Sequence, residues 1–278
     1  MTQLQPQSAA EYALRPEEVE LFNRDGHVTL RNVMSEAELA TIEPLFDEFI
    51  RGEVSGMGRD FCDMRGPYVR KFEDFSLVNA VLPHRYRPEL RGNIYERRCL
   101  SIARQLIGGT ATFDYDQFLA KRPNKPDAVF TWHQDLGYWL TGTPDTQTAT
   151  CSLALDDADH ENGCLAVISG SHKGPLRPHR PLHGGGASGR EISHILSIEL
   201  TAEDKVVELP VRRGDITVHD ERIIHGSGGN RSNLRWRRTY VIAYRSRACV
   251  EYERSIGFTH SHNDKVNWQT HLGALERK

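Results

Sequence analysis

The sequence predicts a mainly β fold with flanking helices, a sandwich or jelly roll preceded by a helical layer. Short strand-like segments recur after residue 110, and turn signals such as Asn162-Gly163 and Arg213-Gly214 separate them. Helical patterns are confined to the residues before 110. With no internal repeat and no linker, we expect a flexible tail over 1–14 and a single domain over 15–278. Its helical layer covers about 15–109 and its β core about 110–250.

The helical layer is predicted from its capping signals. Pro16 suits the first turn of a helix that Asp25-Gly26 ends, and residues 27–33 alternate as a strand does. Ser35 and Glu38 form a capping box at the start of a second helix that ends near residue 52. Residues 52–92 look irregular, and a third helix is expected over 93–107.

The β core is predicted as a series of short strands. The long stretch 173–195, rich in Gly, Pro and His, is the candidate for a lid over a site. The expected strands cover 112–120, 128–133, 148–155, 164–168, 205–210, 215–219 and 239–244.

Composition excludes several classes of protein. A net charge of -3 does not suggest a broad nucleic-acid surface, so we expect no nucleic-acid partner. We also expect no membrane association, because apolar runs stay below the roughly 18 residues that a spanning helix needs. The start of the chain has no signal-peptide layout, and the five cysteines are scattered, which favours the cytoplasm and reduced thiols. The oligomeric state is not encoded in any pattern that we recognise.

A metal site is suggested by Trp132-His133-Gln134-Asp135. In a strand, His133 and Asp135 project to the same face. His225, followed by Gly226, is the best third ligand, since glycine lets other groups approach closely. Two histidines and one carboxylate leave three positions of an octahedron open and suit Fe(II). The spacing alone is weak evidence, and the alternative is a set of hydrogen-bonded polar residues at strand ends.

Residues 15–262 resemble the phytanoyl-CoA dioxygenase family of Fe(II)/2-oxoglutarate oxygenases. The matching segments occur in order: EEVELFNRDGHVTLRNVMSEAEL, DYDQFLAKRP, TWHQDLGYW, SLALDDADHENGCLAVISGSHKGPL, RRGDITVHDERIIHGSGGNRS and RWRRTYVIAY. The resemblance implies a double-stranded β-helix, that is, a cupin-like jelly roll. It also implies that Fe(II) is held by His133, Asp135 and His225, with 2-oxoglutarate and O2 as co-substrates.

The resemblance further implies an arginine about a dozen residues after the second histidine, which binds the distal carboxylate of 2-oxoglutarate through paired hydrogen bonds. The usual spacing reaches Trp236, so one extra residue in the loop makes Arg237 the best match and Arg235 the second choice. Further co-substrate contacts are expected from Gln117, Lys121, Trp139 and Ser227.

The implied activity is hydroxylation, or another oxidation at a C–H bond, of a small molecule such as a secondary metabolite, with release of succinate and CO2. Related halogenases lack the carboxylate ligand, so Asp135 favours a halide-free reaction, while desaturation, epimerisation, epoxidation and cyclisation stay open. Tyr138 and residues 62–75 are candidate substrate walls. The alternatives are a non-catalytic metal- or ligand-binding jelly roll and a zinc hydrolase.

Overall fold

A computed structural model of the protein describes residues 10–140, 142–182, 195–264 and 266. The helices are α1 (Pro16–Asp25), α2 (Glu36–Ile50), α3 (Pro83–Tyr86), α4 (Ile94–Ile107) and α6 (Arg247–Ser255). The strands are β1 (His27–Leu30), β2 (Phe61–Asp63), β3 (Leu77–Val81), β4 (Ala111–Lys121), β5 (Phe130–His133), β6 (Thr148–Ala154), β7 (Leu165–Ile168), β8 (Arg180–Pro181), β9 (Leu196–Ser197), β10 (Val206–Leu209), β11 (Ile216–His219), β12 (His225–Ser227) and β13 (Arg237–Ser246).

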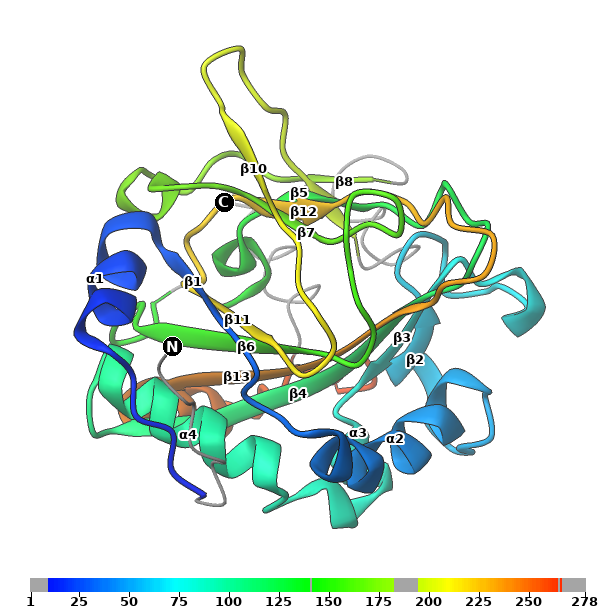
Figure 1. Ribbon diagram of the computed structural model, residues 1–278, viewed down its shortest axis with the longest axis horizontal. Helices are drawn as coiled ribbons and strands as arrows, with labels where there is room; N and C mark the ends of the chain where they lie inside the picture. Colours follow the sequence, from blue (N-terminus) through cyan, green and yellow to red (C-terminus); the bar gives the residue numbers. More distant parts are fainter. Residues whose placement is uncertain (1–9, 141, 183–194, 265, 267–278) are drawn as a thin grey trace, which may run out of the picture.

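Two antiparallel sheets build the core. The larger sheet has the strand order β1-β11-β6-β13-β4-β3-β2, and the smaller one has the order β10-β7-β12-β5. In Figure 1, α2 and α4 lie on one side of the larger sheet and the smaller sheet lies on the other. The sheet therefore has one face covered by helices and one face turned toward the smaller sheet.

The helical layer begins and ends as its caps predict. Ser35 Oγ accepts a hydrogen bond from Glu38 N at 3.4 Å, and the Glu38 carboxylate accepts one from Ser35 N at 2.9 Å, which confirms the capping box of α2. The apolar stripe of α2 packs on the sheet, where the Phe46 ring lies 4.4 Å from the ring of Phe118 on β4. Burial of this stripe stabilises the contact between helix and sheet.

The local structure differs from the sequence expectations in three places. Residues 52–92 are not merely irregular, because β2 and β3 extend the larger sheet there. Part of the predicted tail is anchored: Tyr12 is buried, and its carbonyl accepts a hydrogen bond of 2.7 Å from Gln105 on α4. Helix α6 was not predicted. None of the helices in the described ranges is long and apolar enough to cross a membrane.

The predicted lid, 173–195, lies partly outside the described residues, since 183–194 are not among them. Its described flanks meet as a short antiparallel pair, β8 with β9. Leu196 on β9 donates its N–H to the Tyr138 hydroxyl at 2.9 Å. The base of this segment is thereby tied to one of the predicted substrate walls.

Candidate metal centre

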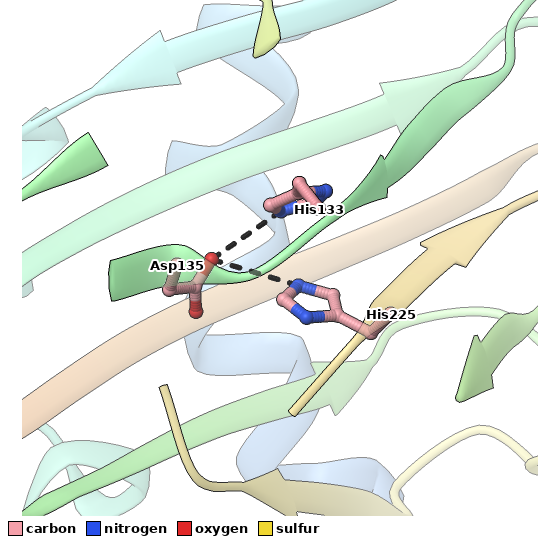
Figure 2. A group of neighbouring side chains, drawn as sticks. All are labelled: His133, Asp135 and His225. Carbon is pink, nitrogen blue, oxygen red and sulfur yellow. Dashed lines mark ion pairs between the residues drawn. The ribbon is translucent and has the colours of Figure 1, made fainter. Parts of the chain in front are cut away.

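The three predicted ligands come together between the sheets. Strands β5 and β12 pair with His133 directly opposite His225. The chain stays extended through Gln134, and Asp135 then begins a short 3-10 helix, so the alternation that places His133 and Asp135 on one face holds beyond the end of the strand. Figure 2 shows the three side chains pointing toward one another. The Asp135 Oδ1 atom lies 3.3 Å from His133 Nε2 and 3.5 Å from His225 Nε2.

Both imidazoles are oriented by carbonyl groups of their own chain segments. His133 Nδ1 lies 2.7 Å from the Thr131 carbonyl, and His225 Nδ1 lies 3.1 Å from the Ile223 carbonyl. Because a carbonyl only accepts, each Nδ1 carries the proton and each Nε2 presents its lone pair to the centre. The His133 Nε2 atom is buried and makes no hydrogen bond with the described residues. That arrangement is the one expected of metal ligands.

The electrostatics favour the protonation states that a metal needs. Burial opposes a charge on Asp135, but the nearby His225, His133 and His219 hold its pKa well below the ordinary value. Burial, reinforced by His133, holds the pKa of His225 well below its ordinary range. An ionised carboxylate beside neutral imidazoles is a ready ligand set, and no cysteine belongs to the cluster formed by the described residues.

The sequence analysis did not predict a third histidine beside this centre. His219, the last residue of β11, lies with Nε2 3.1 Å from Asp135 Oδ2, the carboxylate oxygen that faces away from the other two histidines. Its ring centroid is 4.5 Å from that of His225. His219 is thus placed to orient Asp135 from outside the ligand set, and its distance along the chain gave no spacing signal.

The three arginines near the start of β13 have different surroundings. Arg235 pairs with Asp159 and Glu161 in an exposed cluster, and Arg238 pairs with carboxylates of α2 and the loop after β6. Arg237 is buried opposite Lys121 and forms no ion pair with any described carboxylate. Burial lowers the pKa of Arg237 to about 10. A buried, unpaired guanidinium calls for an anion, which favours Arg237 over Arg235.

The other predicted contacts divide into two groups. Lys121 is fully buried and donates from Nζ to Ser227 Oγ at 2.7 Å, which links the two sheets next to Arg237. Gln117 and Trp139 instead line a cavity of about 60 Å³ that also borders His133 and Asp135. The predicted substrate walls face the same cavity, since Tyr138 and, from the 62–75 stretch, Met64 line it.

Comparison with known proteins agrees with this geometry. The family model described as phytanoyl-CoA dioxygenase (PhyH) matches residues 22–239. The peroxisomal phytanoyl-CoA dioxygenase of Bos taurus is 27% identical over 232 residues, which are 78% of this chain and 64% of that protein. The chain thus covers slightly less than two thirds of that relative.

Solved structures are similar over most of their length. EvdO2 from Micromonospora carbonacea var. aurantiaca complexed with 2-oxoglutarate is 27% identical, with a TM-score of 0.66 over 84% of this chain and 92% of that chain. EctD from S. alaskensis with 2-oxoglutarate and 5-hydroxyectoine, at 18% identity, has a TM-score of 0.65 over 87% of this chain and 79% of that one, and this likeness concerns the fold alone. The predicted jelly roll is confirmed, and the chain belongs to the phytanoyl-CoA dioxygenase family.

Proposed function

We propose that this protein is an Fe(II)- and 2-oxoglutarate-dependent oxygenase whose iron is held by His133, Asp135 and His225. The observation that carries the proposal is the pair of imidazoles whose Nδ1 atoms are bound to carbonyls, so that both Nε2 atoms face one ionised carboxylate oxygen. Three protein ligands leave the remaining positions of an octahedral ion to co-substrates. Family membership and a relative complexed with 2-oxoglutarate support the same function.

Iron(II) at this site would supply the activation of O2, with 2-oxoglutarate converted to succinate and CO2 as one oxygen atom goes to the substrate. The protein's own residues bind and orient. Arg237 binds the distal carboxylate of 2-oxoglutarate, in a position where burial strengthens the attraction between the charges. Lys121 and Ser227 keep the neighbouring backbone in place and offer an amine and a hydroxyl as hydrogen-bond donors to the same carboxylate. Gln117 and Trp139 shape the cavity where the substrate lies.

We infer that the substrate is a small molecule that enters the cavity bordering His133 and Asp135, and that the reaction is a halide-free oxidation at a C–H bond. Asp135 occupies the coordination position that halogenases leave to halide. We further propose that residues 15–278 form one catalytic domain and that the protein works in the cytoplasm. Five buried free thiols support a reducing compartment.

A metal-binding protein without catalytic activity is the other candidate function. It would explain the three ligands but not the buried Arg237, which has no partner among the described carboxylates. A zinc hydrolase would not explain the buried Arg237 either. Both candidates predict that 2-oxoglutarate leaves the spectrum of the iron-loaded protein unchanged.

The test is the anaerobic addition of Fe(II) and 2-oxoglutarate. Chelation of iron by the keto acid produces a visible charge-transfer band, which we expect in the wild type and not in Asp135→Ala. Removal of a charge-assisted contact costs about 1.5–3 kcal/mol, so Arg237→Ala should weaken 2-oxoglutarate binding by about tenfold or more. Arg238→Ala is the matched control and should leave the affinity within about twofold. A wild-type protein without the band, or equal losses in the two arginine variants, would contradict the proposal.

A further inference from the structure

Part of the cavity wall comes from a part of the chain outside the matched family region. After α6, the chain returns to the cavity and places His260 and His262 on its lining, beyond residue 239 where the family match ends. Most of the rest of the lining is aromatic or apolar, as at Tyr115, Phe130 and Tyr138, and it includes no lysine or arginine among the described residues. A histidine there is therefore the natural source of a positive charge toward a substrate.

The backbone around His260 is firmly held. Ser261 Oγ donates to the buried Asp60 carboxylate at 2.8 Å, and the His262 N–H donates to the same carboxylate at 2.7 Å. His260 itself has a φ of 68°, a left-handed conformation that is unfavourable for residues other than glycine. Backbone strain of this kind persists only where the surroundings enforce it, and here it sets the direction of the imidazole.

The two ring nitrogens of His260 have different roles. Nε2 lies 2.9 Å from Asp114 Oδ2 and 3.6 Å from Glu253 Oε2, and both carboxylates are fully buried. The ring packs at 4.5 Å on Tyr115, and only 8% of the side chain is exposed. Nδ1 makes no hydrogen bond with any described residue, and it is not completely shielded from solvent. Because the ring lines the cavity, Nδ1 is the atom left to meet a ligand.

The charges packed around His260 permit a protonated ring. Burial opposes the charge, but the attraction of Asp114 and the hydrogen bond to it raise the pKa of His260 above its ordinary value of 6.5. Arg254 on α6 pairs with Asp114, and Arg245 on β13 pairs with Glu253, so the two carboxylates already have one guanidinium each. Glu221 shares Arg245 at 3.6 Å. A protonated His260 would therefore add a positively charged hydrogen-bond donor to a lining in which Asp135 is the acidic group among the described residues.

We propose that His260 is a substrate-binding residue that donates a hydrogen bond from Nδ1 to an anionic oxygen, and that the substrate class is a small ring-containing carboxylic acid. The inference rests on the proposed function for the position of the reacting C–H bond, because Asp135 and His133 border the same cavity. The aromatic walls would pack on the ring of the substrate, and His260 would hold its carboxylate away from the iron. This arrangement would select among substrates by charge as well as by shape.

The test compares phenylacetate with phenylacetamide, which differ in charge at the same position. Binding is measured by calorimetry on the anaerobic Fe(II) protein saturated with 2-oxoglutarate, while the charge-transfer band reports any displacement of the co-substrate. We expect the acid to bind about tenfold or more tightly than the amide. The preference should disappear in His260→Gln and persist in the matched control His262→Gln. In the wild type it should fade as the pH rises through the raised pKa of His260, because the ring then loses its proton.

Three results would overturn the proposal: an acid that binds no better than the amide or not at all, a preference that survives in His260→Gln, or binding of the acid that bleaches the charge-transfer band. The pH series on the wild type decides the matter if His260→Gln does not fold. Failure of the proposed function looks different, since the charge-transfer band would then be absent while the preference for the acid could still be measured. A band without the preference would refute this inference alone.

Discussion

We infer that the contact between His219 and Asp135 orients a proposed metal ligand, so its removal should weaken metal binding. The substitution His219→Phe keeps a flat ring of similar size next to His225 but removes the donor that lies 3.1 Å from Asp135 Oδ2. The Asp135 carboxylate would keep its charge and its neighbours His133 and His225. It would lose the only hydrogen bond that the described residues make to its outer oxygen.

The size of the effect follows from the geometry. Loss of a partner that orients a metal ligand typically costs 10- to 100-fold in metal affinity. At about 1.4 kcal/mol per factor of ten, that is roughly 1.4–2.8 kcal/mol. The contact at 3.1 Å is of ordinary length, and the side chains of His219 and Asp135 are only 5% and 13% exposed. Burial removes competition from water, so we expect a value toward the upper end of the range.

The assay is anaerobic titration with Fe(II), or with Co(II) as a spectroscopic substitute, against a competing chelator. His84→Phe is the matched control, because His84 Nδ1 makes the same kind of contact, 2.5 Å from the buried Asp116 carboxylate, at a place remote from the ligand set. His84→Phe should leave the metal affinity unchanged. If His219→Phe binds the metal as tightly as the wild type, or if both variants lose the same affinity, the proposed role of His219 is wrong.

Other predictions concern stability and are checked by denaturant unfolding. Ser35→Ala removes the cap of α2 and should cost about 1 kcal/mol. Gly163→Ala should cost about 2 kcal/mol or more, because φ is 78° and a Cβ would lie 2.2 Å from a backbone oxygen, whereas the control Gly92→Ala has a similar φ of 72° in open space and should cost about 1 kcal/mol. Arg245→Met removes the buried partner of Glu253 and should cost about 3–5 kcal/mol. Equal losses at the two glycines, or an Arg245→Met variant as stable as the wild type, would contradict the reasoning.

The meeting of His133, Asp135 and His225 could be predicted because the family resemblance picked out two residues in one extended segment and a third in a glycine-rich motif. The position of Arg237 needed the pairing of β13 with β4, which places Arg237 opposite Lys121 and turns it toward the interior. The contact of His219 with Asp135 could not be predicted, since it joins residues 84 positions apart through the packing of the two sheets.

The missed strands and helix have physical reasons as well. Strand β3 is buried along its whole length, so Leu77–Val81 shows no alternation of apolar and polar residues. Helix α6 is short and carries many polar residues, and it is held by the buried Glu253, whose partner Arg245 lies on the neighbouring strand. Both elements are specified by tertiary contacts rather than by a local pattern.

The carbonyl groups that orient the two imidazoles have a consequence for how the proposed oxygenase could diversify. Each belongs to the main chain two residues before its histidine, at Thr131 and Ile223, so its position does not depend on any side chain. The reactive centre is thus separable from the residues that choose the substrate. A new set of side chains around the cavity, His260 included, would alter the proposed substrate choice and leave the two histidines of the proposed iron site in place.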